Sequence, residues 1–247
     1  MNSPLNLSEL RRMGELAQSA YQPEFRTIAD RATQTAARII KSPDEIIIAL
    51  RGTANVENWL EDLEIFQEVL TGRVKVHAGF LKAANALIPD IIEELLPGKT
   101  GKDQLPPIKV TGHSLGGALA KLIAYFLHDA GFNVQDVTTF ASPRVGNAAW
   151  RDDYNARLGD NTLRVVACGD LVPLVPGILD GYRHSGQEVY LDGQVWLNPS
   201  RILEVMADSW RVWRAIERGD WAFVLQFHSM TSDYLRLLPA QNPEPKA

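Results

Sequence analysis

The sequence predicts an α/β domain in which helices cover both faces of a central, mostly parallel sheet. Two segments, Ile46–Leu50 and Leu163–Cys168, would form strands whose two faces are both largely apolar. Strands buried in parallel sheets have this character. Segments with helical periodicity follow most of the predicted strands, and this alternation is typical of βαβ units. A chain of 247 residues is long enough to bury a full core as one domain.

The elements follow from periodicity and from the turn residues between them. Helices are expected at residues 5–20, 79–96, 115–126, 146–158, 200–217 and 220–237. Strands are expected at residues 35–41, 45–50, 106–111, 136–141 and 163–168, with a small hairpin over 188–195. Residues 1–238 are predicted to form the single domain, and the polar, proline-rich residues 239–247 are predicted to be a disordered tail.

Composition excludes several classes of protein. The net charge of −5 argues against nucleic-acid binding, which needs a basic surface. A single cysteine, Cys168, rules out an internal disulfide and fits a reducing compartment. No apolar run reaches the length of a membrane span, and the first 21 residues lack the apolar core of a signal peptide. The alternatives are a cytoplasmic protein, an unconventionally exported one, and a mature chain whose signal peptide has been removed. No bound metal is expected.

The segment Val110–Ala118 contains the pattern Gly-x-Ser-x-Gly, as Gly112, Ser114 and Gly116. An apolar strand pattern precedes it and a helical pattern follows it, which is the setting of a nucleophile elbow. Such a turn strains the serine backbone, and glycines on either side remove the Cβ atoms that would clash. The helix that begins behind the serine directs backbone N–H groups at any oxyanion formed there. The alternative is an ordinary glycine-rich turn.

A serine nucleophile needs a base and a carboxylate that orients it, and in α/β-hydrolases these follow the serine in the order acid, then histidine. Asp170 comes directly after a predicted strand and is the expected acid. Asp160, Asp180 and Asp192 fall in turns and are expected to be solvated. Two histidines follow Asp170, namely His184 and His228. The residues alone favour His228, but only modestly. The reason is that an apolar stretch before His228 could anchor a loop that returns to Ser114.

Several motifs, in order from about Ile46 to His228, resemble those of the class 3 lipases, the family of the fungal triacylglycerol lipases. They are Leu50–Thr53, Asn58–Leu63, Val76–Phe80, Val110–Ala118, Phe140–Asn147, Asp170–Pro173, Gly181–His184, and His228 followed by Tyr234. The resemblance implies an α/β-hydrolase fold with Ser114, Asp170 and His228 as the triad, and it implies that His184 is not catalytic. Fungal members carry disulfides and a secretion signal, which this sequence lacks.

The resemblance also implies an oxyanion hole formed by the backbone N–H groups of Thr53 and Leu115. Residues 55–63 resemble the lid helix of the family. Their apolar side chains fall on one stripe of a helix, formed by Val56, Trp59, Leu60 and Leu63. The alternative for this segment is an amphipathic helix packed permanently on the core, and the alternative for Thr53 is a helix cap.

Two further groups of apolar residues have two interpretations each. Trp210, Trp213 and Trp221 alternate with arginines and could meet a lipid surface, but we expect them to pack beneath the catalytic loop. Leu174 and Val175 follow the acid and are expected to line an acyl pocket, although they could equally be ordinary loop packing.

The sequence therefore predicts a serine carboxylic-ester hydrolase that cleaves acylglycerol esters through an acyl-enzyme and needs no cofactor. The expected partner is an ester or lipid substrate, with contact to a lipid–water interface. A second interpretation keeps the triad but changes the substrate to phospholipid, galactolipid or a feruloyl ester. A third, from another class, is a non-catalytic lipid-binding protein on a hydrolase fold.

Overall fold

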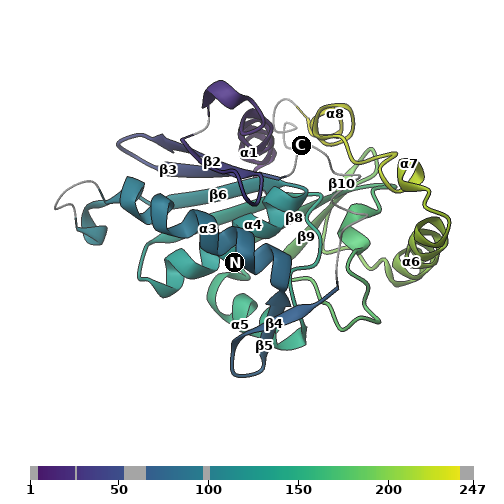
Figure 1. Cartoon of the computed structure of the whole chain (residues 1–247). Helices are drawn as coiled ribbons and strands as arrows, with labels where there is room; N and C mark the ends of the chain where they lie inside the picture. The colour runs from purple at the N-terminus through teal and green to yellow at the C-terminus, as the bar shows by residue number, and fades with distance from the viewer. Residues whose placement is uncertain (1–4, 26, 53–64, 97–100, 240–247) are drawn as a thin grey trace.

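An eight-stranded sheet forms the centre of the computed structural model, which describes residues 5–25, 27–52, 65–96 and 101–239 (Figure 1). Its spatial order is β1-β2-β3-β6-β7-β8-β9-β10. The strands are β1 (Ile28–Asp30), β2 (Thr35–Lys41), β3 (Ile46–Arg51), β6 (Ile108–His113), β7 (Val134–Phe140), β8 (Thr162–Ala167), β9 (Gln187–Leu191) and β10 (Val195–Leu197). A separate antiparallel pair is formed by β4 (Gln67–Thr71) and β5 (Val74–His77).

The five central strands, β3 to β9 in the spatial order, run parallel, and antiparallel hairpins close both edges of the sheet. In β3, Ile48 lies opposite Val110 of β6, and Val110 lies opposite Val137 of β7. All three side chains are buried. The mostly parallel sheet predicted from the doubly apolar segments is confirmed, because only buried strands can be apolar on both sides.

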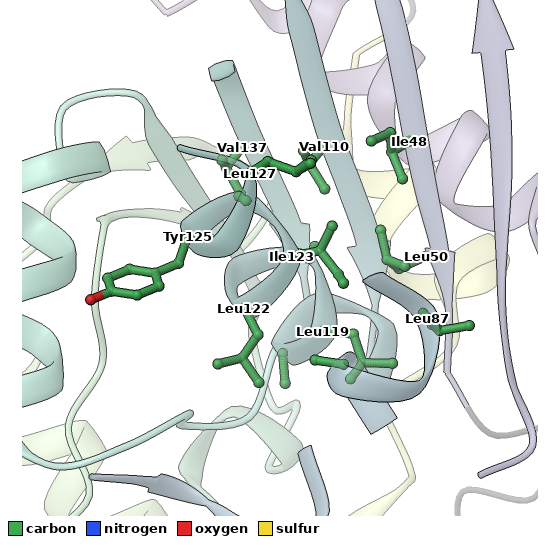
Figure 2. Close-up of a cluster of buried hydrophobic side chains, with 14 of the residues drawn as sticks. Ile48, Leu50, Leu87, Val110, Leu119, Leu122, Ile123, Tyr125, Leu127 and Val137 are labelled. Atoms are coloured by element: carbon green, nitrogen blue, oxygen red, sulfur yellow. The ribbon is translucent and has the colours of Figure 1, made fainter. Parts of the chain in front are cut away.

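Helices cover both faces of the sheet, and each face has its own core. One core lies under α3 (Ala78–Leu95), α4 (Leu115–Asp129) and α5 (Ala148–Leu158) and contains Ile48 and Leu50. Figure 2 shows these two side chains turned toward Leu119 and Ile123 of α4. The other core lies under α1 (Leu7–Ser19) and contains Ile47. Burial of one such side chain contributes about 1.5–3 kcal/mol, so β3 stabilises both layers.

The C-terminal part of the described chain returns to α1. The π-helical turn η4 (Met230–Tyr234) and the short helix α8 (Leu235–Leu237) pack on the α1 side of the sheet. Arg11 of α1 donates hydrogen bonds of 2.8 Å to the carbonyl oxygens of Leu235 and Leu238. Elements from the two ends of the sequence thus lie side by side (Figure 1).

The prediction of a continuous helix over residues 220–237 is wrong. The structure has α6 (Ile202–Glu217), then the single turn α7 (Trp221–Val224), and then a loop that carries His228 into η4. The break has local causes, because Asp220 caps the N-terminus of α7 and Ser229 caps that of η4. Such side chains offer the backbone an alternative to a continuing helix.

Several short elements were not expected from the sequence. They are β1, the β4–β5 pair, and the 3-10 turns η1 (Pro23–Phe25), η2 (Lys102–Gln104) and η3 (Val172–Leu174). The side chains of β4 are exposed or half-buried, so this strand lacks the apolar alternation that reveals one. Among the described helices, none combines the length and the apolar character needed to cross a bilayer.

Lys121 of α4 is a buried cation with little compensation. Its side chain is fully buried, and its Nζ donates one hydrogen bond of 3.3 Å, to the carbonyl oxygen of Ser185. No carboxylate pairs with it among the residues that the structure describes. Burial lowers the pKa of Lys121 well below its usual value, and nearby Arg164 lowers it further, because both disfavour the charged form.

The variant Lys121→Met is therefore expected to unfold with a larger free energy at neutral pH, by about 1–3 kcal/mol. The unfolded chain holds the lysine proton up to a pH near 10.5, whereas the folded chain releases it earlier. Wild-type stability consequently rises with pH in that window, and its deficit relative to the variant shrinks. Urea unfolding from pH 7 to 10.5 measures this, with the exposed Lys82→Met as the control. A gap that does not change with pH would contradict the assignment.

Candidate active site

Ser114 sits on a sharp turn between β6, which ends at His113, and α4, which begins at Leu115. Its backbone has φ 58° and ψ −130°, a conformation that residues with a Cβ rarely adopt. The turn brings backbones into contact on both sides of the serine. A Cβ added at Gly112 would collide with the carbonyl of Gly116, and one added at Gly116 would collide with that of Leu50. Only glycine fits at these two positions.

Asp170 and His228 form a buried pair at the carboxyl end of β8. His228 Nδ1 lies 3.0 Å from Oδ2 and 3.1 Å from Oδ1 of Asp170. The carboxylate accepts two further hydrogen bonds, at 2.5 Å from the Tyr234 hydroxyl and at 3.0 Å from the backbone N–H of Val172. With these donors around it, the carboxylate is fixed in orientation, and it in turn fixes the imidazole.

His113 connects the serine turn to His228. The two imidazole rings lie 4.7 Å apart between centroids, and His113 Nε2 lies 2.9 Å from the carbonyl oxygen of His228. Burial lowers the pKa of His113 well below its usual value, so the ring is neutral. Contact with a carbonyl assigns the proton of the neutral ring to Nε2, which donates. Because His113 precedes Ser114, this bond holds the His228 backbone beside the elbow.

Two atoms of this group are buried and have no hydrogen-bond partner among the described residues: Ser114 Oγ and His228 Nε2. These are the atoms between which a nucleophilic serine passes its proton to a histidine base. Catalytic hydrogen bonds of this kind often tighten only when substrate is bound. Leu115 is the first residue of α4, and its N–H belongs to the helical turn whose donors have no intrahelical partner.

Five of the predicted site residues lie outside the described part of the structure. They belong to residues 53–64 and comprise Thr53 of the oxyanion hole and Val56, Trp59, Leu60 and Leu63 of the lid. Gly52, which precedes them, is buried against the elbow, where an added Cβ would lie 2.9 Å from the N atom of Gly116. The roles of Thr53 and of the lid stay predictions.

His184 does not reach the Asp170 carboxylate. Its Nε2 lies 2.7 Å from the carbonyl oxygen of Pro173, in the loop that follows the acid. Arg144, which the sequence analysis did not single out, is also buried and donates to the carbonyl oxygens of Leu174 and Pro176. These two basic side chains hold the loop that carries Leu174 and Val175. A buried arginine gives no periodic signal, so the sequence alone offered no way to find it.

The expectation that the three tryptophans pack in the core is wrong for two of them. Trp210 is 60% exposed and Trp213 is 54% exposed. Only Trp221 packs on the apolar cluster that contains Leu171 and Val224. The reason is the rotation of α6, which turns Val212 and Ala215 toward that cluster and the two tryptophans away from it.

Comparison with known proteins assigns the family. Residues 47–179, more than half of the chain, match the family described as lipase (class 3). The chain belongs to the class 3 lipases. The match covers the Ser114 elbow, the Asp170 acid and the Arg144 loop, and it ends before His228. Among the residues of this class 3 lipase that the structure describes, no cluster of three or more metal-ligating side chains occurs.

Named relatives support the assignment. The chain is 38% identical over 151 residues to a secreted mono- and diacylglycerol lipase of Fusarium solani, covering 60% of this chain and 44% of that protein. It is 31% identical to a chloroplastic phospholipase A1 of Arabidopsis thaliana, covering 63% and 39%. The chain therefore spans less than half the length of these relatives.

A solved structure extends the comparison to the fold. It is described as a triacylglycerol lipase with a serine protease triad as its catalytic centre. It superimposes with a TM-score of 0.65 at 26% identity, covering 75% of this chain and 80% of that one. This class 3 lipase thus has the α/β-hydrolase fold that its motifs predicted.

Removal of the Tyr234 hydroxyl tests how strongly the acid is held. A hydrogen bond to a charged group contributes about 1.5–3 kcal/mol, and one between neutral groups about 0.5–1.5 kcal/mol. Tyr234→Phe is therefore expected to lose more unfolding free energy than Tyr154→Phe. Tyr154 is the matched control, because it is also fully buried and its hydroxyl pairs with neutral Thr162 at 2.9 Å. Equal losses in urea unfolding would show that Asp170 is not the charged acceptor inferred here.

Proposed function

We propose that this class 3 lipase is a serine carboxylic-ester hydrolase that cleaves acylglycerol esters through an acyl-enzyme. Ser114 is the nucleophile, His228 the general base and Asp170 the residue that orients it. The observation that carries the proposal is the buried His228–Asp170 pair, at 3.0 Å, whose remaining ring nitrogen is unbonded among the described residues. A serine held in a strained turn beside this pair supplies the group that such a base activates.

In this mechanism, His228 Nε2 takes the proton from Ser114 Oγ as that oxygen attacks the ester carbonyl. Asp170 holds the Nδ1 proton and stabilises the imidazolium that forms. The backbone N–H of Leu115 donates to the tetrahedral oxyanion, with Thr53 as the second donor in our proposal. One such donor typically contributes about 2.7–4 kcal/mol to the transition state. His228 then protonates the departing alcohol, and water attacks the acyl-enzyme by the same route.

The acylglycerol assignment rests on chemistry near the acid. Leu174 and Val175 follow Asp170 in a loop that packs on Val212 and Val224, so an apolar cluster begins directly after the acid. We propose that this cluster receives the acyl chain. The relative from Fusarium solani is named for mono- and diacylglycerol, which supports a glycerol ester as the substrate. The relative named phospholipase A1 favours a phospholipid as the second candidate.

A lipid-binding protein without catalysis accounts less well for this site. Burial of a carboxylate and an imidazole costs free energy unless each is bonded. A binding protein has no use for a buried histidine that a carboxylate orients beside a serine in a strained turn. A nucleophilic serine needs this combination of a base and an orienting carboxylate.

Hydrolysis of an ester series, from two-carbon to long acyl chains and including diacylglycerol and phosphatidylcholine, tests the proposal. We expect activity on glycerol esters that falls about 10⁶-fold in Ser114→Ala, as loss of a triad nucleophile does. Ser142→Ala is the control, because Ser142 is also a buried serine and its hydroxyl bonds only the neighbouring carbonyl. Wild-type rates equal to those of Ser114→Ala on every ester would refute the enzyme assignment. Preference for phosphatidylcholine would move the substrate to the second candidate.

The choice of base is tested with two variants: His228→Ala combined with Ser114→Ala, and His184→Ala alone. Triad residues act as a unit, so the double variant Ser114→Ala/His228→Ala is expected to be no slower than Ser114→Ala alone. His184→Ala, measured where circular dichroism shows it folded, is expected to keep the chemical step, since the hydrogen bond of His184 goes to the backbone carbonyl of Pro173 and not to Asp170. Strictly multiplicative losses from Ser114 and His228 would argue that the two do not form one catalytic unit.

A further inference from the structure

Helix α6 has a half that packs and a half that faces solvent. Val212 and Ala215 are buried on the apolar cluster of the acid loop. The opposite half presents large side chains: Met206 is 65% exposed, Trp210 60% and Trp213 54%. We call this half the aromatic–arginine face, and it consists of Met206, Trp210, Trp213, Arg211, Arg214 and Arg218.

The face has two parallel rows. Met206, Trp210 and Trp213 fall at i, i+4 and i+7, which places them in one line along the helix. Arg211, Arg214 and Arg218 fall at i, i+3 and i+7, in the neighbouring line, with Arg218 in the turn after the helix. The Arg214 guanidinium lies 5.1 Å from the centroid of the Trp210 ring. The two rows therefore touch and form one surface.

Two arginines of this row lack an ion-pair partner among the described residues. Arg211 pairs with Asp208 at 3.0 Å, but Arg214 and Arg218 form no ion pair among the described residues. Of the two other nearby acids, Glu217 is exposed at the end of the aromatic row, and Asp220 accepts the capping hydrogen bond of α7. A cleft of about 220 Å³ lies among these arginines, and Trp210, Phe223 and Asp220 also line it. On a chain of net charge −5, the guanidinium groups of Arg214 and Arg218 remain available to an anion from outside the protein.

The surface continues to the rim of the candidate active site. Phe223 and Phe227 are 40% and 41% exposed. Phe227 directly precedes His228, and its ring lies over Gly169, the neighbour of Asp170. A planar surface that contacts α6 would therefore also come near the residues that flank the base and the acid.

We propose that the aromatic–arginine face docks this protein on an anionic phospholipid surface. Tryptophan rings lie at the boundary between headgroups and acyl chains, and arginines beside them bind lipid phosphate. A protein partner would not require this separation into an apolar row and a cationic row, whereas a lipid surface presents apolar and anionic layers side by side. The proposal deepens the proposed function by naming the surface from which an ester would be drawn, but docking itself needs no catalysis.

Vesicle sedimentation with the full-length Ser114→Ala protein tests docking without turnover. Vesicles of phosphatidylcholine alone are compared with vesicles of equal parts phosphatidylcholine and phosphatidylglycerol. We expect binding to the anionic vesicles, weakened roughly 10- to 30-fold by Arg214→Gln/Arg218→Gln, since each basic side chain near an anionic surface contributes about 1 kcal/mol. Trp210→Ala/Trp213→Ala is expected to weaken it at least as much. Trp196→Ala is the control, because Trp196 is 46% exposed on β10, outside this face.

Several outcomes would overturn the proposal. They are absence of binding to both vesicle types, binding that neither double variant changes, and equal binding to neutral and anionic vesicles. A shift from dimer to monomer in Trp210→Ala/Trp213→Ala, with vesicle binding unchanged, would show instead that the face joins two copies of this chain. With Ser114 restored, hydrolysis of a soluble short-chain ester is expected to be unchanged in both variants. Inactivity of the wild type on that ester, with docking retained, would refute the proposed function alone.

Discussion

The left-handed backbone of Ser114 is the constraint on which the rest of the site depends. A non-glycine residue in this region costs roughly 1–3 kcal/mol and persists only when its surroundings determine it. The surroundings here are the Leu50 carbonyl, the Gly112–Gly116 contact and the bond of 2.9 Å from the Ser114 N–H to the Phe140 carbonyl. These contacts come from three neighbouring parallel strands, so Ser114 can hold its backbone conformation only when the strands lie in this order.

The same edge of the sheet gathers the other groups. Asp170 follows β8, and His113 ends β6 and holds the His228 backbone. Carboxyl ends of parallel strands meet at one edge, where loops from distant parts of a sequence become neighbours. The loop after the acid is itself held by buried donors on its carbonyls, from Arg144 and His184. Both side chains are buried, and their hydrogen bonds go to backbone carbonyls rather than to carboxylates. This burial costs free energy, and in return it fixes a loop that has no regular structure.

Sequence reasoning predicted the sheet, the elbow and the candidate acid, because each has a local pattern: doubly apolar strands, spaced glycines, and an aspartate after a strand. It could not choose firmly between His184 and His228 from the residues alone, since the choice depends on where a loop returns. It also placed Trp210 and Trp213 in the core. Those tryptophans belong to an apolar stripe like any other, and only the packing of Val212 and Ala215 decides which side of α6 faces the protein.

The bonds from Arg11 to Leu235 and Leu238 span more than 200 residues of sequence. They anchor the segment that carries His228 and Tyr234 onto α1, an element that is synthesised long before that segment. Chains fold during synthesis as their segments emerge, so the sheet and the Ser114 turn can form while this site is still without its histidine. The Ser114 turn can thus form before the histidine that we propose as its base is in place, and until then the nascent chain carries an elbow that lacks this base.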